Sequence, residues 1–258
     1  MKDMLSIEKF HEYFHTVIAC SQELRTEVYQ LRYKVYCQEF HYEKEEEHPG
    51  HEEHDAYDEH SIHCVIIHKA SGKTAGWVRL VLPNPENPKD PLPFEKYCAD
   101  SLDRDIINPT TLPRNSFGEI SRLAVLADFR RRHKEHETPI GLAEETAHDG
   151  TERRHFPYIP VGLYLSAASL GLLAGLDSVF AMMEPRLARH IYRFGIKPMQ
   201  VGKIIDYHGP RAPFYINRHM FQDGLKPEIQ LLLQNIKSDL EKDIARIKPG
   251  LLKFPVVR

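Results

Sequence analysis

The sequence has few cysteines, little net charge and no long uninterrupted hydrophobic run. The four cysteines are Cys20, Cys37, Cys64 and Cys98. They lie far apart and form no C-x-x-C pair, so we expect reduced thiols rather than a disulfide framework. The formal net charge of -3 argues against general nucleic-acid binding, because that function requires a strongly basic surface.

The most apolar stretch, residues 161–183, is interrupted by serine, glycine and aspartate. A membrane-spanning helix needs about 20 consecutive, mostly apolar residues, so we predict a buried helix, a turn and a strand here instead. Residues 1–21 carry charges throughout and lack the apolar core of a signal peptide. We therefore expect a cytoplasmic protein with no integral membrane segment.

Apolar residues recur at helical spacing in three places. The first set (Phe10, Tyr13, Phe14 and Val17) predicts an N-terminal helix within residues 1–21. The second predicts a helix over residues 22–39. The third predicts a closing amphipathic helix within a C-terminal helical extension of residues 224–258.

Between these helices, strand and helix patterns follow one another. HCVIIHKASGKTAGWVRLVLP predicts a hairpin that turns at Ser-Gly-Lys, and FGEISRLAVL predicts another strand. A helix over 160–175, a strand over 177–183 and a helix over 185–194 come next, and two further strands follow. This order predicts a single α/β domain, residues 1–258, around a mixed sheet.

Three charged residues fall inside strands whose neighbours are apolar. Arg79 lies in GWVRLVLP, and Glu119 and Arg122 lie in FGEISRLAVL. A charge at a buried strand position is costly unless an opposite charge pairs with it. We expect Asp55 and Asp58, in the acidic connector of residues 40–60, to be the partners. A purely structural role, in which ion pairs hold the N-terminal region on the sheet, is the alternative.

Arg32 and Tyr36 share one face of the predicted helix over residues 22–39, because they are four positions apart. LRYKVY, D-x-x-D at 55–58, G-W-x-R-L and G-E-I-S-R-L-A-V together resemble the acyl-homoserine-lactone synthases and the related N-acyl amino acid synthases. The resemblance implies a GNAT-like acyl-CoA N-acyltransferase fold. That fold is α/β (α+β), with a mixed central sheet flanked by helices and with a C-terminal helix.

The second half of the chain carries a further resemblance. PRLARHIYRFGIKPMQVGKIIDYHGPRAPFYIN is similar to the acyltransferases associated with the PEP-CTERM/exosortase protein-sorting system. Together the resemblances cover about residues 22–220. One position departs from the pattern, because the tryptophan expected after the first helix is missing and Phe40 or Tyr42 stands in its place. The acceptor amine therefore stays open.

The resemblance implies transfer of a fatty acyl group from acyl carrier protein, or acyl-CoA, to the amine of an amino acid or related small molecule. It implies no tightly bound cofactor. An α-amine is largely protonated at neutral pH, so a base must remove its proton, and we predict Glu119 as this base with Arg122 as its catalytic neighbour. The predicted substrate-binding residues are Arg32, Tyr36, Asp55, Asp58 and Arg79.

Two of these arginines have alternative expected roles. Arg79 and Arg122 either hold a substrate carboxylate or pair with the connector carboxylates, since guanidinium forks suit carboxylates. Backbone N–H groups of residues 123–125 are candidates to stabilise a tetrahedral oxyanion. An acyl-homoserine-lactone synthase and a non-catalytic module that binds acyl carrier protein or a lipid are the competing functions.

A basic run replaces the Gly-rich loop with which acetyl-CoA-dependent members of this fold bind pyrophosphate. We predict that it receives the acidic surface of acyl carrier protein, although an ordinary solvated charge run is the alternative. The docking candidates are Arg130, Arg131, Arg132 and Lys134, with Arg153 and Arg154 as additional ones.

The connector and its surroundings are rich in histidine. His51-x-x-His54 beside Asp55 is compatible with metal ligation, but the connector contains no His-Glu-x-x-His and Pro49-Gly50 does not indicate a rigid site. We therefore expect no metal, and we expect the connector to fold over the amine site. The alanines and glycines of the predicted helix over 160–175 leave room for a long acyl chain.

Overall fold

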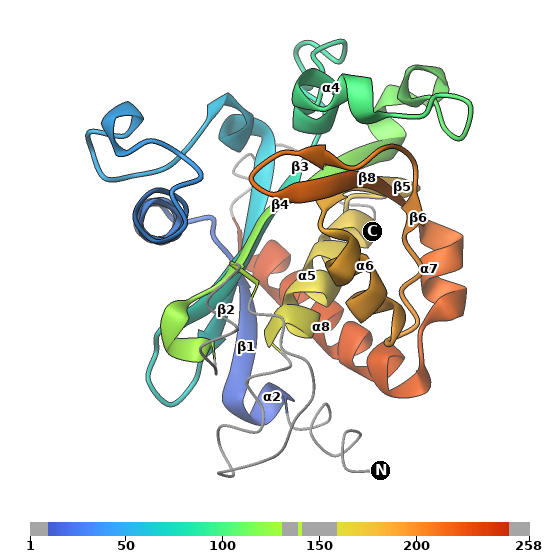
Figure 1. Cartoon of the computed structure of the whole chain (residues 1–258). Helices are drawn as coiled ribbons and strands as arrows, with labels where there is room; N and C mark the ends of the chain where they lie inside the picture. Colours follow the sequence, from blue (N-terminus) through green and yellow to red (C-terminus); the bar gives the residue numbers. More distant parts are fainter. Residues whose placement is uncertain (1–9, 131–138, 141–158, 248–258) are drawn as a thin grey trace.

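The computed structural model describes residues 10–130, 139–140 and 159–247. These residues build a mixed sheet of eight strands in the order β1-β2-β3-β4-β5-β8-β6, with β7 paired to β8 (Figure 1). The strands are β1 (Phe14–Ile18), β2 (Ser61–His68), β3 (Thr74–Val81), β4 (Phe117–Val125), β5 (Ser178–Met183), β6 (Met199–Gln200), β7 (Ile205–Asp206) and β8 (Pro210–Asn217). The predicted α/β fold with a mixed sheet is confirmed.

Helices cover both faces of the sheet. Figure 1 shows α5, α6 and α8 on one face and α3, seen end-on, on the other. The helices are α2 (Phe10–Tyr13), α3 (Gln22–Arg32), α4 (Pro93–Tyr97), α5 (Ile159–Leu173), α6 (Pro185–Tyr192), α7 (Arg218–Gly224) and α8 (Pro227–Arg246). Of these, α7 was not predicted, whereas the helices near 160–175, 185–194 and 227–247 are confirmed.

The central helix α5 is buried between the sheet and α8. Nearly every residue on it is apolar or small, and most are buried on all sides, as expected for a helix enclosed by other elements. Helix α8 instead buries a single stripe (Ile229, Leu232, Leu233, Ile236 and Leu240). No helix in the described part of the chain is both long enough and apolar enough to cross a membrane.

The predicted N-terminal helix is wrong over its second half. Among the described residues of this segment, 10–21, Phe10–Tyr13 is helical and Phe14–Ile18 forms β1, the edge strand paired antiparallel with β2. In β1, buried Phe14, Thr16 and Ile18 alternate with half-buried residues, which is the period of a strand. The apolar spacing from Phe10 to Val17 also fits a helix, and this ambiguity explains the error.

Strand β4 departs from regular geometry at its middle. It pairs in parallel with β5 over Phe117–Glu119, and its antiparallel register with β3 shifts between Trp77 and Arg79. Arg122 lies beside this shift with a φ of 51°, a left-handed conformation that residues with a Cβ rarely adopt outside turns and bulges. The bulge ends the pairing of β4 with β5, and a cavity opens between the two strands.

Two glycines of α5 provide a matched test of this packing. A Cβ added at Gly162 would lie 2.7 Å from the ring of Phe10, whereas a Cβ at Gly171 would meet nothing closer than Val179 at 3.6 Å. We expect Gly162→Ala to lower the free energy of unfolding by about 1–3 kcal/mol through overpacking. Gly171→Ala should keep it or raise it by up to about 1 kcal/mol, because alanine favours a helix. Urea denaturation of both variants checks this, and equal stabilities would contradict the packing described.

Candidate active site

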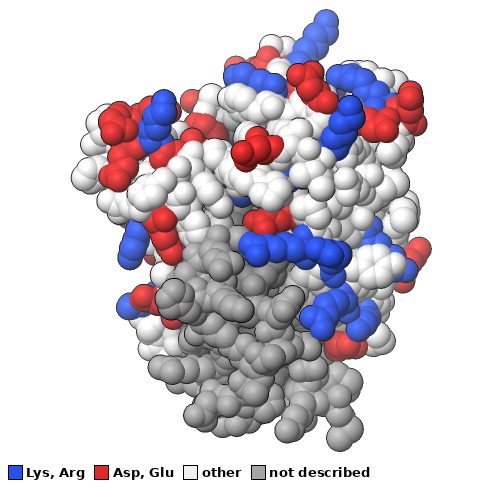
Figure 2. Space-filling view, in the orientation of Figure 1, with Lys and Arg blue, Asp and Glu red and all other residues white. Residues whose placement is uncertain are grey.

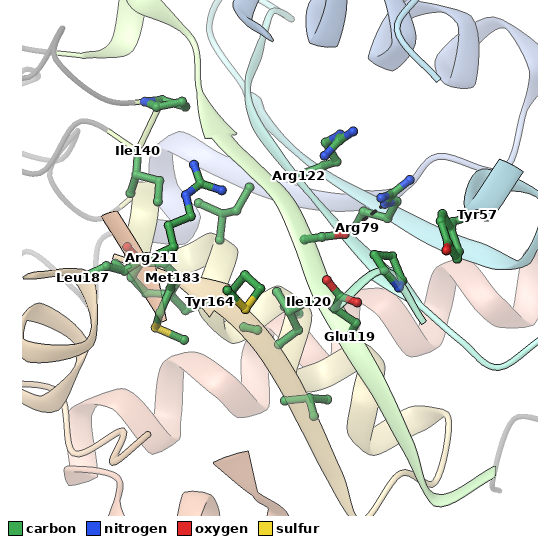
Figure 3. Close-up of a pocket in the computed structure, with 18 of the residues that line it drawn as sticks. Tyr57, Arg79, Glu119, Ile120, Arg122, Ile140, Tyr164, Met183, Leu187 and Arg211 are labelled. Atoms are coloured by element: carbon green, nitrogen blue, oxygen red, sulfur yellow. Dashed lines mark hydrogen bonds between the residues drawn. The ribbon is translucent and has the colours of Figure 1, made fainter. Parts of the chain in front are cut away.

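A cavity of about 520 Å³ lies where β4 and β5 diverge, and its lining changes from charged to apolar. Figure 3 shows Arg79, Glu119, Arg122 and Tyr57 on one side of β4, and Ile140, Tyr164, Met183 and Leu187 on the other. The ionisable residues that line the cavity include Glu43, Glu53, Asp55, Arg79, Glu119, Arg122, His208 and Arg211. This division suits a substrate with one polar and one apolar part.

A buried ion-pair network lies behind the charged end. Arg32 Nε donates to Glu53 Oε2 (2.6 Å), Arg32 Nη2 donates to Glu53 Oε1 (3.0 Å), and Arg32 Nη1 donates to Asp58 Oδ1 (2.7 Å). Burial alone would raise the pKa of Glu53, but the charges of Arg32 and Arg122 hold it well below its usual range. Because Arg32 and Asp58 do not line the cavity, they position the connector and do not contact a substrate there.

Arg79 joins this network to the sheet. Its Nη1 donates to Asp55 Oδ1 (2.7 Å) and to Asp58 Oδ1 (2.9 Å), and its Nε donates to Ser121 Oγ (3.0 Å). Asp55 and Asp58 also form a capping box on the short 3-10 helix Ala56–His60, which fixes both carboxylates. The structure therefore brings together Arg79 and the two aspartates predicted as its partners.

Arg122 is held by carboxylates of the connector. Its Nη2 donates to Glu43 Oε1 (3.0 Å) and to Glu53 Oε1 (3.1 Å), and Asp55 lies 3.5 Å away. Its guanidinium also lies 5.5 Å from the centre of the Tyr36 ring. Since Arg79 and Arg122 are already paired, the structure favours the second of their two predicted roles, which is to fix the connector.

Sequence reasoning missed Glu53, although it is the carboxylate that Arg32 and Arg122 share. The acidic run around it gives no sign of which glutamate turns inward, because its neighbours Glu45–Glu47 are exposed. Charge balance was the available signal: three buried arginines cannot be neutralised by Asp55 and Asp58 alone.

Glu119 lies at the junction of the two ends of the cavity and is only 3% exposed. Its Oε2 accepts a hydrogen bond from the Phe94 N–H (2.8 Å). Burial raises the pKa of Glu119 to about 8, and the Phe94 N–H and the charges of Arg79 and Arg122 reduce this shift without cancelling it. A carboxyl that titrates near neutral pH inside a cavity is suited to general acid–base chemistry.

Aromatic residues from distant parts of the chain close the charged end. Tyr36 lies in the π-helix Tyr33–Glu39, which continues α3 and completes the predicted helix over residues 22–39. The Tyr42 ring lies 5.1 Å from the His208 ring in the β7–β8 turn. Of the two residues that stand in place of the expected tryptophan in the sequence, Tyr42 lines the cavity and Phe40 does not.

His208 is neutral in this setting. Burial and the neighbouring charges of Arg211 and Arg122 lower the pKa of His208 to about 4. Its Nε2 lies 3.8 Å from Glu43 Oε1. The β7–β8 turn therefore approaches the connector at the charged end of the cavity, and His208 adds no positive charge there.

The apolar end is built largely by α5, as its small residues suggested. Ala167, Ala168 and Gly171 face the cavity, and Met183 and Leu187 complete the wall from β5 and α6. Small side chains on the helix leave the space open, while the long side chains opposite them exclude water. The predicted room for an acyl chain is present.

Other predicted site residues have different positions. The Arg130 side chain is buried, pairs with Glu39 and lies over the Phe40 ring, so it does not offer a surface for docking. The remaining docking candidates (Arg131, Arg132, Lys134, Arg153 and Arg154) lie outside the described residues. In addition, the Val125 N–H donates to Pro139 O (2.8 Å), which removes it from the amides predicted to stabilise an oxyanion.

The histidines of the connector pack against aromatic rings. His51 stacks on Tyr33 with ring centres 5.0 Å apart, and His54 lies 5.4 Å from the Tyr29 ring. Within residues 10–130, 139–140 and 159–247, no three metal-binding side chains come together.

The comparisons with known proteins agree on the fold. Residues 31–136 match the family described as acetyltransferase (GNAT) domain. Among solved structures, TofI in complex with an inhibitor and MTA has a TM-score of 0.56 at 16% identity, and the match covers 83% of this chain and 99% of TofI. This chain has a GNAT fold. The family match and the fold support the prediction of an acyltransferase.

Two further solved structures of similar fold are synthases. The CoA-dependent acyl-homoserine lactone synthase BjaI, solved with MTA, has a TM-score of 0.56 at 16% identity and covers 95% of this chain and 94% of its own. FeeM, an N-acyl amino acid synthase from uncultured soil microbes, has a TM-score of 0.50 at 11% identity and covers 86% and 97%. No curated protein sequence matches this chain.

Removing the Glu53 carboxylate, which Arg32 and Arg122 share, should destabilise the protein. We expect Glu53→Gln to lower the free energy of unfolding by about 3 kcal/mol or more, because it leaves Arg32 and Arg122 buried without sufficient negative charge. The control is Glu46→Gln on the same connector, where the exposed side chain should change stability by less than about 0.5 kcal/mol. Urea denaturation of both measures the difference, and a stable Glu53→Gln protein would refute the importance of this pair.

The raised pKa of Glu119 predicts a pH dependence of stability. An acid whose folded pKa (about 8) exceeds its ordinary 4.5 stabilises the fold fully below pH 4.5 and loses that contribution as pH rises toward 8. Glu119→Gln keeps an acceptor for the Phe94 N–H and has no charge to desolvate. Its Tm relative to wild type should therefore increase from pH 5 to pH 9, as measured by thermal unfolding, whereas that of Glu46→Gln should not. A constant difference would show that Glu119 titrates normally.

Proposed function

We propose that this protein is an N-acyltransferase that moves a fatty acyl group from acyl carrier protein, or from acyl-CoA, to the amine of an amino acid or related small molecule. The observation that carries the proposal is the position of Glu119. It is a buried carboxyl with a pKa near 8, placed where the charged end of the cavity meets the apolar end. A thioester carbonyl bound there has its chain on one side and an amine on the other.

The reaction needs one proton acceptor at this junction. The neutral amine attacks the thioester carbonyl, an N–C bond forms, and the amine proton passes to the Glu119 carboxylate directly or through one water. Collapse of the tetrahedral intermediate breaks the C–S bond, and the same proton can leave with the thiolate. A base with a pKa near 8 is partly ionised at neutral pH and still accepts a proton readily.

The ion-pair network around Arg32 and Glu53 holds the residues of the amine site in place. Arg79 fixes Asp55 at the cavity wall and Glu53 fixes Arg122 there, through partly buried hydrogen bonds. The acceptor therefore meets side chains that do not need to reorganise. Tyr36 and Tyr42 supply flat apolar surfaces beside these charges. In this proposal Asp55, Arg79, Arg122 and Tyr36 shape the amine site, and Arg32 and Asp58 hold it in place.

In this proposal the acyl chain of the donor lies in the apolar end of the cavity. BjaI has been solved with SAM and isopentyl-CoA, so a fold of this kind accommodates a CoA derivative that carries a hydrocarbon chain on its sulfur. Figure 2 shows basic side chains gathered over the region of α6, a helix whose Arg186 and Arg189 are exposed. This surface suits the acidic acyl carrier protein, and Arg131, Arg132 and Lys134 stay candidates for the same role. Association with a PEP-CTERM/exosortase system and a cytoplasmic location follow from the sequence resemblance and belong to the proposal.

Expression in a bacterial host tests the activity, because the host supplies acyl carrier protein thioesters and amino acids. We expect new N-acyl amines in lipid extracts of cells that express the wild type, and a loss of about 100-fold or more with Glu119→Gln, as for removal of a general base. Mass spectrometry of the extracts names both substrates. Glu46→Gln is the control and should give wild-type amounts.

Each other outcome points to a different function. An acyl-homoserine lactone in the extract would identify a lactone synthase. The absence of any new lipid, together with binding of acyl carrier protein by the purified protein, would favour a non-catalytic binding module. A product formed equally by wild type and Glu119→Gln would refute Glu119 as the base.

A further inference from the structure

Arg211 differs from the arginines that hold the connector. Arg32, Arg79 and Arg122 are each paired with connector carboxylates. Arg211 lines the same cavity, yet within the described part of the chain no carboxylate lies at ion-pair distance from it. Its Nε is buried and has no hydrogen-bond partner. A buried donor left without an acceptor is costly, and such groups often mark the place of a ligand.

The β7–β8 hairpin fixes where Arg211 sits. Arg211 pairs with Ile205 across the hairpin, and the next residue, Ala212, pairs with Met183 at the end of β5. This is the part of the cavity beyond the end of β4–β5 pairing. Figure 3 shows the Arg211 side chain in the cavity on the same side of β4 as Ile140 and Met183, across that strand from Arg79 and Glu119.

The neighbours of Arg211 keep its charge available. The Tyr42 ring lies 5.7 Å from the guanidinium, which holds the side chain by a cation–π contact without neutralising it. His208, three residues earlier in the β7–β8 turn, is neutral, since its pKa is about 4. Glu43, which also lines the cavity, is hydrogen-bonded to Arg122.

We propose that Arg211 binds an oxyanion of a substrate, either the carboxylate of the acceptor amine or the phosphate that carries the donor's pantetheine arm. A guanidinium presents two parallel N–H groups that match the oxygens of either anion. The inference rests on the proposed acyl transfer and deepens it, because it requires that one substrate be anionic near the thioester. It also assigns to Arg211 the anion-binding role that Arg79 and Arg122 cannot fill while they are paired.

Binding of small acyl ligands to the full chain tests this without turnover. The first pair of probes is N-dodecanoylglycine and its neutral analogue N-dodecanoylglycinamide. The second pair is S-dodecanoyl-4′-phosphopantetheine and S-dodecanoylpantetheine, which lacks the phosphate. Calorimetric titration of wild type, Arg211→Gln, Arg211→Lys and the control Arg246→Gln, an exposed arginine on α8 that does not line the cavity, gives the affinity of each.

We expect wild type to prefer the anionic member of one pair. Arg211→Gln should weaken binding of that member by about 10- to 100-fold, the range for loss of a charged hydrogen bond, and leave the neutral member unchanged. Arg211→Lys should recover part of the loss, and Arg246→Gln should behave as wild type. The pair that responds identifies the source of the anion, and thermal unfolding of each variant excludes a folding defect.

Two results would overturn the inference. If wild type binds the acyl ligands and Arg211→Gln changes neither pair, or changes both members of a pair equally, Arg211 is not an anion site although acyl transfer stands. If wild type binds none of the four ligands, the proposed acyl transfer fails, and the role of Arg211 in it fails as well.

Discussion

The buried pairing of Arg32 with Glu53 is the constraint on which the site depends. These side chains come from α3 and from the connector, and both are almost fully buried, so neither charge is tolerable without the other. Glu53 then reaches Arg122 on β4, and Asp58 links Arg32 to Arg79 on β3. One set of contacts therefore ties a helix, a loop and two strands together, and it decides where the wall of the cavity lies.

This pairing also explains why Glu119 has a high pKa beside two arginines. An unpaired arginine at short range would lower the pKa of a carboxyl, but Arg79 and Arg122 are already neutralised by Asp55, Asp58 and Glu53. Desolvation is then the largest influence on Glu119. The structural and catalytic roles of the acidic residues are thus linked. The connector carboxylates neutralise Arg79 and Arg122, and Glu119, which has no such partner, titrates near neutral pH.

The sequence allowed the sheet and its covering helices to be predicted better than the site. Apolar runs such as GWVRLVLP and the all-apolar α5 permit one structure each, whereas the short stretch from Phe10 to Val17 fits two periods and was assigned to the wrong one. Arg79, Glu119 and Arg122 could be identified because they are charged residues inside apolar strands. The sequence did not identify Glu53 or Arg211 as site residues. Burial of a single residue in a loop, or at the start of a short hairpin, leaves no periodic signal in the sequence. The lack of an ion-pair partner for Arg211 is visible only in three dimensions.

The structural and catalytic readings of these charges apply to different residues. Ion pairs that merely hold the N-terminal region on the sheet describe Arg32, Glu53 and Asp58 well, since Arg32 and Asp58 lie behind the cavity wall and Arg32 pairs with both carboxylates. That reading does not account for Glu119 or Arg211, which face the cavity and form no ion pair within the described residues. Glu119 is buried with a single hydrogen bond, from the Phe94 N–H, and the Arg211 Nε is buried with no acceptor among the described residues, so each keeps part of its desolvation cost. This desolvation cost is best explained by a ligand whose amine contacts Glu119 and whose anionic group contacts Arg211.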